Sequence, residues 1–221
     1  MIMSRENLEL MEMDTENFLA RFVTMDDSWV HHYEPETKEQ SKQWKHPDSP
    51  TPRKAKVTAS AGKVMASVFW DAQGVLLVDY LQKGQTINGA YYAELLRQLR
   101  EKIKEKRRGM LRRGIIFHQD NAPVHKSTTA MAQIAECGFE LLPHPPYSPD
   151  LAPSDFHLFP NMKKNLAGRK FASDDEVMDA VSSYLEDQDL EFYRRGILGL
   201  QHRWTKCVDL HGDLLKNKPL V

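Results

Sequence analysis

Short apolar runs in this chain alternate with longer segments in which apolar residues recur every three or four positions. Runs of about four to eight residues rich in apolar, β-branched or aromatic side chains are typical of strands. Five such runs are present, at residues 21–24, 64–71, 75–81, 114–118 and 139–142. The turn Asp71-Ala72-Gln73-Gly74 separates the second run from the third, so the pattern predicts a β-hairpin there.

Helical periodicity is clearest in residues 88–108, where Tyr91, Leu95, Leu99 and Ile103 recur at four-residue spacing. Further helices are predicted at residues 121–137, at 153–166, after a capping box at 173–176, and around 192–204. Strands come first and then alternate with helices. This order predicts an α/β fold with a mixed sheet flanked by helices.

The boundaries of the helix at 121–137 follow from local signals. Asn121 is suited to the N-cap and Pro123 to an early helical position, while Gly138 is a suitable stop.

Composition excludes several protein classes. The chain has 221 residues, of which 41% are hydrophobic, and this suits one large or two small globular domains. It contains no apolar run of 18 residues, so we expect no membrane span, and its acidic, polar first residues do not form a secretory signal. Cys137 and Cys207 are far apart without a CxxC spacing, which indicates free thiols.

Charge is segregated along a chain whose net charge is only −1. Residues 97–113 contain nine Lys or Arg and two acids, and residues 42–63 contain six bases and one acid. Residues 171–191 contain eight acids and no base. Such segregation permits a local phosphate-binding face on a near-neutral protein. On charge alone, a solvated helix face at 97–113 is the favoured explanation of the first cluster.

Residues 33–63 are polar and contain four prolines and few large apolar residues. A segment of this length without its own structure is typical of a functional or disordered insertion. Trp44 lies within it and is a candidate for contact with a partner subunit or a flipped base. Trp29, Trp70 and Trp204 lie in apolar stretches and are expected in the core.

Three aspartates occur where a metal site could form. Asp120 follows an apolar strand, Asp155 falls in the first turn of a predicted helix, and Asp26 lies beside the first predicted strand. Carboxylates are hard oxygen ligands suited to Mg²⁺ and Mn²⁺, and two such ions can promote phosphoryl transfer. Singly, each aspartate has an ordinary structural explanation, as a strand-end, turn or helix N-terminal residue.

The sequence segments around these aspartates are a more specific signal than the aspartates themselves. Residues 118–125 read His-Gln-Asp-Asn-Ala-Pro-Val-His, and residues 142–155 read Leu-Pro-His-Pro-Pro-Tyr-Ser-Pro-Asp-Leu-Ala-Pro-Ser-Asp. Both segments closely resemble the mariner branch of the Tc1/mariner transposases, in which 34 residues separate the second and third catalytic aspartates, as between Asp120 and Asp155 here. The resemblance continues at residues 18–29, 69–71, 83–87 and 192–208, and so covers nearly the whole chain.

This resemblance implies an RNase H-like catalytic domain in residues 18–212, with residues 33–63 as a clamp loop. It implies that Asp26, Asp120 and Asp155 are the catalytic and metal-binding residues, holding two Mg²⁺ ions that Mn²⁺ can replace. The expected activity is cleavage of DNA and strand transfer in the nucleus. The expected partners are DNA and a second copy bound through the clamp loop, with no membrane and no small-molecule cofactor.

The chain also departs from the family pattern. The family usually has Gly-Asp-Glu-Lys around the first aspartate, whereas Met25-Asp26-Asp27-Ser28 stands here. Residues 1–17 resemble the end of an interdomain linker, so we expect the chain to lack the helix-turn-helix modules that recognise transposon ends. Residues 213–221 are expected to be a divergent tail.

Other side chains are predicted to assist. His118, Asn121 and His125 are candidates for contacts behind the metal ligands, although packing or structural hydrogen bonds are the simpler role for the two histidines. The proline-rich residues 145–149 could be a polyproline ligand, but a rigid loop that positions Asp155 is the favoured interpretation. Candidate DNA-binding bases are Lys42, Lys45, Arg53, Lys54, Lys56, Lys104, Lys106, Arg107, Arg108, Arg112 and Arg113.

Two other functions stay open. A domesticated or truncated transposase domain could serve as a non-catalytic DNA-binding or dimerisation module with its aspartates intact but unused. A general nuclease of RNase H-like fold could act on RNA–DNA hybrids, but the mariner-specific segments favour this less.

Overall fold

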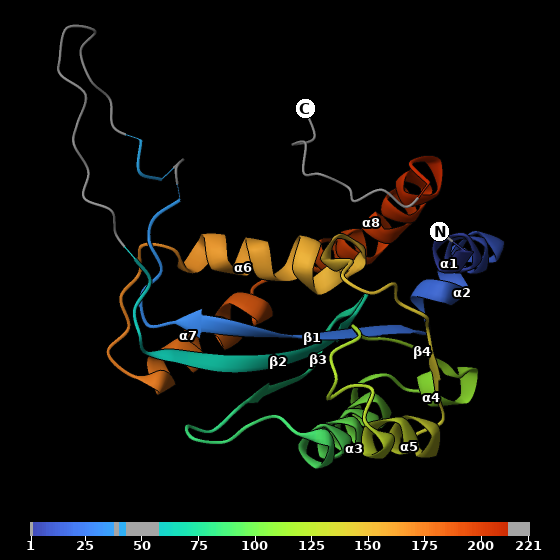
Figure 1. Ribbon diagram of the computed structural model, residues 1–221, viewed down its shortest axis with the longest axis horizontal. Helices are drawn as coiled ribbons and strands as arrows, with labels where there is room; N and C mark the ends of the chain where they lie inside the picture. The colour runs from blue at the N-terminus through green and yellow to red at the C-terminus, as the bar shows by residue number, and fades with distance from the viewer. Residues whose placement is uncertain (1, 38–39, 43–57, 212–221) are drawn as a thin grey trace, which may run out of the picture.

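A five-stranded mixed sheet forms the centre of the computed structural model, which describes residues 2–37, 40–42 and 58–211 (Figure 1). Trp44 and four candidate DNA-binding bases, Lys45, Arg53, Lys54 and Lys56, lie outside the described residues. The strands are β1 (Phe22–His31), β2 (Lys63–Asp71), β3 (Gly74–Tyr80), β4 (Ile115–His118) and β5 (Phe139–Leu141). Their order across the sheet is β3-β2-β1-β4-β5.

The register of the sheet explains how distant segments meet. β2 pairs antiparallel with β1 and with β3, and the second pairing confirms the predicted hairpin. β4 runs parallel to β1, with Phe22 opposite Ile116 and Thr24 opposite His118. The ladder between β1 and β4 ends at this last pair, so the chain leaves β4 beside the first half of β1.

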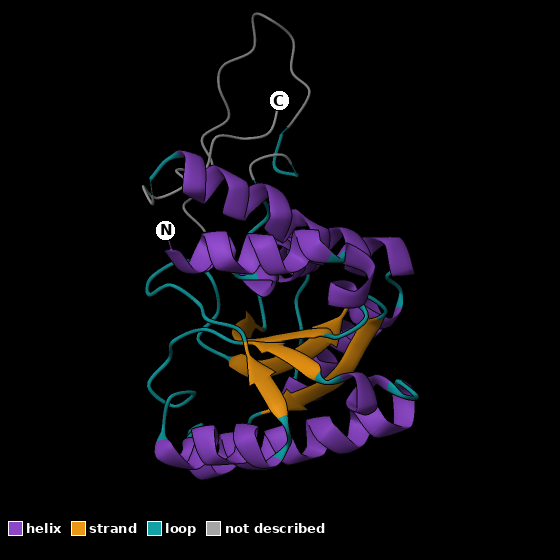
Figure 2. Ribbon diagram, turned by 90° about the vertical axis from the view of Figure 1, so that its right-hand side faces the viewer, coloured by secondary structure: helices purple, strands orange, loops and turns teal. Residues whose placement is uncertain are grey.

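Helices cover both faces of the sheet (Figure 2). One face packs against α1, α2, α6, α7 and α8, and the other packs against α3 and α5. The helices are α1 (Ile2–Met13), α2 (Thr15–Leu19), α3 (Gly89–Lys106), α4 (Met110–Arg113), α5 (Thr128–Glu136), α6 (Phe159–Leu166), α7 (Asp174–Glu186) and α8 (Leu190–Asp209). The expected mixed sheet flanked by helices is confirmed.

Alternation along the strands assigns side chains to the two cores. In β4, Ile116 enters the core beneath α8, while Ile115 and Phe117 enter the core beneath α3 and α5. Successive strand residues point to opposite faces, so a strand with helices on both sides reads as a continuous apolar run. This is why residues 114–118 could be identified as a buried strand without a visible alternation.

Two expectations about local structure are wrong. The helix expected from Asn121 begins only at Thr128, with Ser127 as its N-cap. The Asn121 side chain instead donates a 2.7 Å hydrogen bond from Nδ2 to the carbonyl oxygen of His144, so it holds two loops together. Trp70 and Trp204 are buried as expected, but Trp29 is 39% exposed, with the Lys63 ammonium 4.0 Å from its ring centroid.

The segment before residue 18 is part of the packed structure. α1 lies against α8, and Met11 is fully buried in the core of that face. Asn7 donates from Nδ2 to the carbonyl oxygen of Pro143 at 2.9 Å. Both cysteines are free and buried, and Cys207 accepts a hydrogen bond from Ser4. No helix among the described residues has the length and apolarity needed to cross a membrane.

Candidate active site

Three elements from distant parts of the sequence carry the three aspartates. Asp26 lies in the middle of β1, and Asp120 lies two residues beyond the end of β4. Each of the two lies two residues beyond the last pair of the parallel β1–β4 ladder, Thr24 with His118, and Asp120 is close enough to raise the pKa of Asp26. Asp155 lies in a single π-helical turn, Ser154–Leu158, that leads into α6 on the face to which Asp26 points.

The turn that carries Asp155 is held from two sides. Trp70 Nε1 donates to Ser154 Oγ at 3.0 Å, and both residues are fully buried. From α8, Arg203 donates to the carbonyl oxygen of Asp150 at 2.9 Å, and its guanidinium lies 4.0 Å from the centroid of the Phe156 ring. The proline-rich segment before Asp155 is therefore anchored on the sheet and on α8.

Asp120 is fixed by the loop that follows it. Its Oδ1 accepts hydrogen bonds from the Ala122 amide at 3.0 Å and from His125 Nδ1 at 2.6 Å. Burial alone would raise the pKa of Asp120, but these two hydrogen bonds outweigh it and hold the pKa below its ordinary value. The carboxylate therefore stays ionised, with Oδ1 occupied by the protein.

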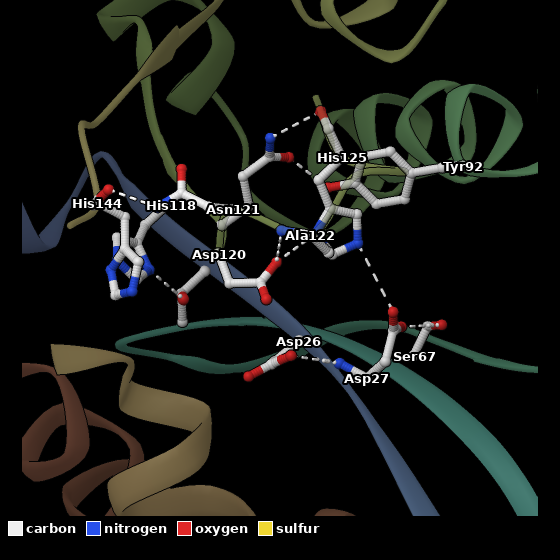
Figure 3. A network of polar contacts seen from close by, with 12 residues as sticks. Asp26, Asp27, Ser67, Tyr92, His118, Asp120, Asn121, Ala122, His125 and His144 are labelled. Atoms are coloured by element: carbon white, nitrogen blue, oxygen red, sulfur yellow. Dashed lines mark hydrogen bonds and ion pairs between the residues drawn. The ribbon is translucent and has the colours of Figure 1, made fainter. Parts of the chain in front are cut away.

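His125 links Asp120 to Asp27, as Figure 3 shows. Its Nε2 lies 3.6 Å from Asp27 Oδ2, and its ring packs against Tyr92, tilted by 34°, with 4.3 Å between centroids. Burial lowers the pKa of His125, but the hydrogen bonds with the two carboxylates outweigh it and raise the pKa to about 9. His125 is therefore an imidazolium that bridges two carboxylates.

Asp27 faces away from Asp26, because neighbouring strand residues point to opposite sides of the sheet. Its Oδ1 accepts a hydrogen bond from Ser67, the residue opposite it in β2, at 2.5 Å. Sequence reasoning treated Asp27 only as a departure near Asp26 and missed its contact with His125. Only the pairing of β1 with β2 and the path of the loop after β4 reveal that contact.

Asp26 and Asp155 form the negative part of the site. Burial raises the pKa of Asp26 well above its ordinary value, and repulsion from Asp155 raises it further. The Asp155 residue is exposed, but partial desolvation of its carboxyl group raises its pKa. The neighbouring Asp120 raises the pKa of Asp155 further. A hydrogen bond with Asp26 and the positive charge of Lys163 oppose this increase. The ionised forms of Asp26 and Asp155 are therefore disfavoured, whereas that of the neighbouring Asp120 is favoured.

His118 lies behind the site rather than in it. It is fully buried, and its ring nitrogens contact Thr24 Oγ1 at 3.0 Å and His144 Nδ1 at 3.1 Å. Burial lowers the pKa of His118 to about 3, and the neighbouring His144 adds to this. The imidazole is therefore neutral, and it ties β1 to β4 and to the loop after β5.

A cavity of about 470 Å³ opens between Asp120 and Asp155. Its lining includes Lys126, His144 and Tyr147, and the side chain of Tyr147 is 95% exposed. The sequence alone did not mark Lys126, which directly follows the family-like segment 118–125, and it marked Tyr147 only as part of the proline-rich residues 145–149. A polyanion that reached the two aspartates through this cavity would pass a lysine and an exposed aromatic ring.

The donor set suits a hard divalent cation, because it brings three carboxyl groups together. Burial, and then repulsion from a neighbouring aspartate, raises the pKa of Asp26 and of Asp155. Among the residues with described positions, no three Asp, Glu, His or Cys side chains are arranged to enclose a metal ion. Magnesium sites commonly use only one or two carboxylates together with water and substrate phosphate. The residues present therefore fit such an ion without a preformed protein cage.

The candidate DNA-binding bases differ in environment. Lys42, Lys104, Arg108, Arg112 and Arg113 are exposed, and Lys106 is exposed with Nζ 3.3 Å from the Val75 carbonyl oxygen. Arg107 differs from the others, because it donates two hydrogen bonds to the buried Asp71, at 2.7 and 3.0 Å. Its guanidinium is only partly exposed and is neutralised inside the protein. The DNA-binding role of Arg107 stays a prediction, for a guanidinium already paired with Asp71.

Residues 34–113 match the family model described as a transposase with a partial DDE domain. This match lies between Asp26 and Asp120 and includes none of the three aspartates. The Mariner Mos1 transposase of Drosophila mauritiana is 37% identical over 202 residues, covering 90% of this chain and 58% of that protein. The chain thus spans less than two thirds of the transposase that it resembles.

Solved structures agree with the sequence comparison. The catalytic domain of Mos1 mariner transposase superposes with a TM-score of 0.79 at 32% identity, covering 97% of this chain and 92% of that domain. The Mos1 mariner paired end complex, solved with Mn, gives a TM-score of 0.87 at 34% identity, covering 97% of this chain and 62% of that one. The same complex has also been solved with Mg. The likeness confirms the expected RNase H-like fold.

Proposed function

The chain belongs to the mariner transposase family, and from this we propose that it catalyses metal-dependent cleavage of DNA phosphodiesters and strand transfer of the freed 3′ end. The observation that carries the proposal is the convergence of three aspartates: Asp120 and Asp155 line one cavity, and repulsion from both of them helps to raise the pKa of the buried Asp26. A protein that needed these residues only for its fold would gain nothing from that repulsion.

Each aspartate has its own place in the proposed site. Asp120 offers Oδ2 to a metal ion while His125 and the Ala122 amide hold Oδ1. Burial and repulsion from Asp155 disfavour the ionised form of Asp26, and a bound cation would offset this. Two bound Mg²⁺ ions, replaceable by Mn²⁺, would activate the attacking oxygen and stabilise the leaving oxygen. The protein residues fix the carboxylates, and Lys126 attracts the phosphate chain.

Further assignments follow the family and stay proposals. The partner is DNA, encountered in the nucleus, and a second copy of the chain binds through residues 33–63 as a clamp loop. The catalytic domain spans residues 18–212, residues 1–17 correspond to the linker end, and residues 213–221 form a divergent tail. The rival proposal is a binding or dimerisation module with unused aspartates.

A cleavage assay on supercoiled DNA separates these proposals. We expect the parent protein to nick or linearise the DNA with Mg²⁺ or Mn²⁺ and not with EDTA. Asp120→Asn and Asp155→Ala should each lose about a thousandfold in rate, or roughly 4 kcal/mol of transition-state stabilisation. Equal, metal-independent traces from all three proteins would support the non-catalytic module instead.

His125 is proposed as a positioning residue for Asp120, because it occupies one carboxylate oxygen and leaves the other for the metal. We expect His125→Ala to raise the metal concentration for half-maximal cleavage about 10–100-fold, as for other residues behind metal ligands. Titration of the cleavage rate with Mn²⁺ measures this.

Tyr92→Phe is the matched control for that titration. It removes the hydroxyl that donates to Gln119 and so destabilises the same loop without touching Asp120. If both variants shift the metal requirement equally, loop stability rather than the Asp120 contact explains the effect.

A further inference from the structure

A groove lined by basic side chains lies where α3 ends and α4 begins. Its volume is about 460 Å³, and its charged lining consists of Arg100, Lys104, Arg107, Arg108 and Arg112. The chain reverses at Gly109, whose φ of +86° places it in the left-handed region. This reversal returns Arg112 toward the last turns of α3, so bases from two helices face one concavity.

The groove carries an excess of positive charge. Arg107 is neutralised by Asp71, and Arg100 and Lys104 lie 3.4 and 3.6 Å from a single acid, Glu101. Arg108 and Arg112 are exposed and have no acidic partner in the part of the chain that the structure describes. Four bases therefore face one acid, which leaves about three uncompensated positive charges.

The buried ion pair of Arg107 gives the groove a rigid wall. Asp71 is 1% exposed and lies at the turn between β2 and β3, so the two hydrogen bonds from Arg107 fix the end of α3 on the sheet. Basic residues near a helix C-terminus are favoured by the helix dipole, which accounts for Lys104. The dipole does not account for Arg108 and Arg112, which lie beyond the last turn of α3.

The groove is separate from the aspartate site. α4 leads into the start of β4, whereas Asp120 follows the end of β4, so the two sites lie toward opposite ends of this strand (Figure 1). β4 alone spans roughly 13 Å at about 3.3 Å per residue. A phosphate held at the aspartates therefore cannot also lie in the groove.

We propose that this groove binds the phosphate backbone of duplex DNA at a distance from the phosphodiester being cleaved. The inference rests on the proposed function, which supplies DNA as the partner. Exposed guanidiniums without acidic partners bind phosphate with paired hydrogen bonds and release counterions on binding. The contacts read no bases, so the groove strengthens binding to any duplex and makes that binding sensitive to salt.

Fluorescence anisotropy of a labelled duplex in EDTA tests the groove without cleavage. We expect the full chain carrying Arg108→Glu and Arg112→Glu to bind about tenfold or more weakly than the parent near 0.1 M salt. We also expect the slope of log affinity against log salt to fall in magnitude by roughly two, one for each lost phosphate contact. Circular dichroism checks that the variant is folded.

Arg5→Glu combined with Arg195→Glu is the control, because both residues are exposed and lie on helices of the other face of the sheet. It changes net charge by the same amount, so long-range attraction to DNA changes equally. Affinity and slope that are the same in the two double variants would overturn the inference. So would a parent that binds no duplex, or a groove variant that alters only self-association in sedimentation.

The groove and the proposed function can fail separately. If the parent binds duplex through the groove but never cuts supercoiled DNA, the groove stands and the catalytic proposal fails. If the parent cuts with metal and the groove variant binds as the control does, the catalytic proposal stands and the groove fails.

Discussion

Asp26→Asn is expected to abolish metal-dependent cleavage and, at the same time, to raise the stability of the metal-free protein. Burial and repulsion from Asp155 both raise the pKa of Asp26, which means that its ionised form is disfavoured in the fold. Asparagine keeps the shape and removes the charge. We expect a loss of about a thousandfold in cleavage rate and a gain on the order of 1 kcal/mol in stability.

Thermal unfolding without metal measures the second effect. A gain of 1 kcal/mol corresponds to a rise in Tm of roughly 2–4 °C for a domain of this size. Mg²⁺ should stabilise the parent more than the variant, because binding to the native state raises its stability by mass action. The opposite signs for activity and stability are typical of a residue kept for function.

Asp27→Asn is the matched control, one residue further along β1. Asp27 contacts His125 and Ser67 instead of the other two aspartates, so removing its charge should leave Tm unchanged or lower it. If Asp26→Asn lowers Tm as much as Asp27→Asn does, the carboxyl group of Asp26 is structural and the proposed metal role loses its electrostatic support.

Arg107→Met is expected to produce the largest loss of stability among the basic residues. The Asp71 side chain is 2% exposed, and without Arg107 it would keep, among the residues that the structure describes, only the Gln73 amide as a hydrogen-bond donor. Removing one partner of a buried ion pair costs about 3–5 kcal/mol, because the other charge is left without compensation. Urea unfolding should show this loss of free energy. Thermal unfolding should show a fall in Tm of roughly 10 °C.

Two variants make this result interpretable. Arg108→Met changes the neighbouring exposed residue and should alter stability by no more than about 0.5 kcal/mol. Asp71→Asn combined with Arg107→Met should recover part of the loss, because the buried charge is then absent. A small, equal effect of Arg107→Met and Arg108→Met would mean that the ion pair contributes little and that Arg107 is available for DNA.

Local signals predicted most of the secondary structure. The hairpin at β2 and β3, the helix α3 and the capping serine of α7 depend on neighbouring residues, and all are present. The start of α5 was wrong because Asn121 and Pro123 satisfy the rules for a helix N-terminus, yet Asn121 bonds to the loop after β5. A tertiary partner outweighed a local preference there.

By itself, the sequence determined the fold class and the family resemblance, and it singled out three aspartates as candidate metal ligands. It could do so because apolar periodicity and family-like segments are properties of contiguous residues. Only the tertiary structure decided which charges meet. The parallel pairing of β1 with β4 brings Asp26 near Asp120. The pairing of β1 with β2 places Asp27 opposite Ser67, and its carboxylate reaches His125. Likewise, the docking of α3 on the hairpin turns Arg107 inward and leaves Arg108 exposed. These outcomes depend on contacts between residues far apart in the chain, and those contacts exist only once the sheet and its helices are assembled.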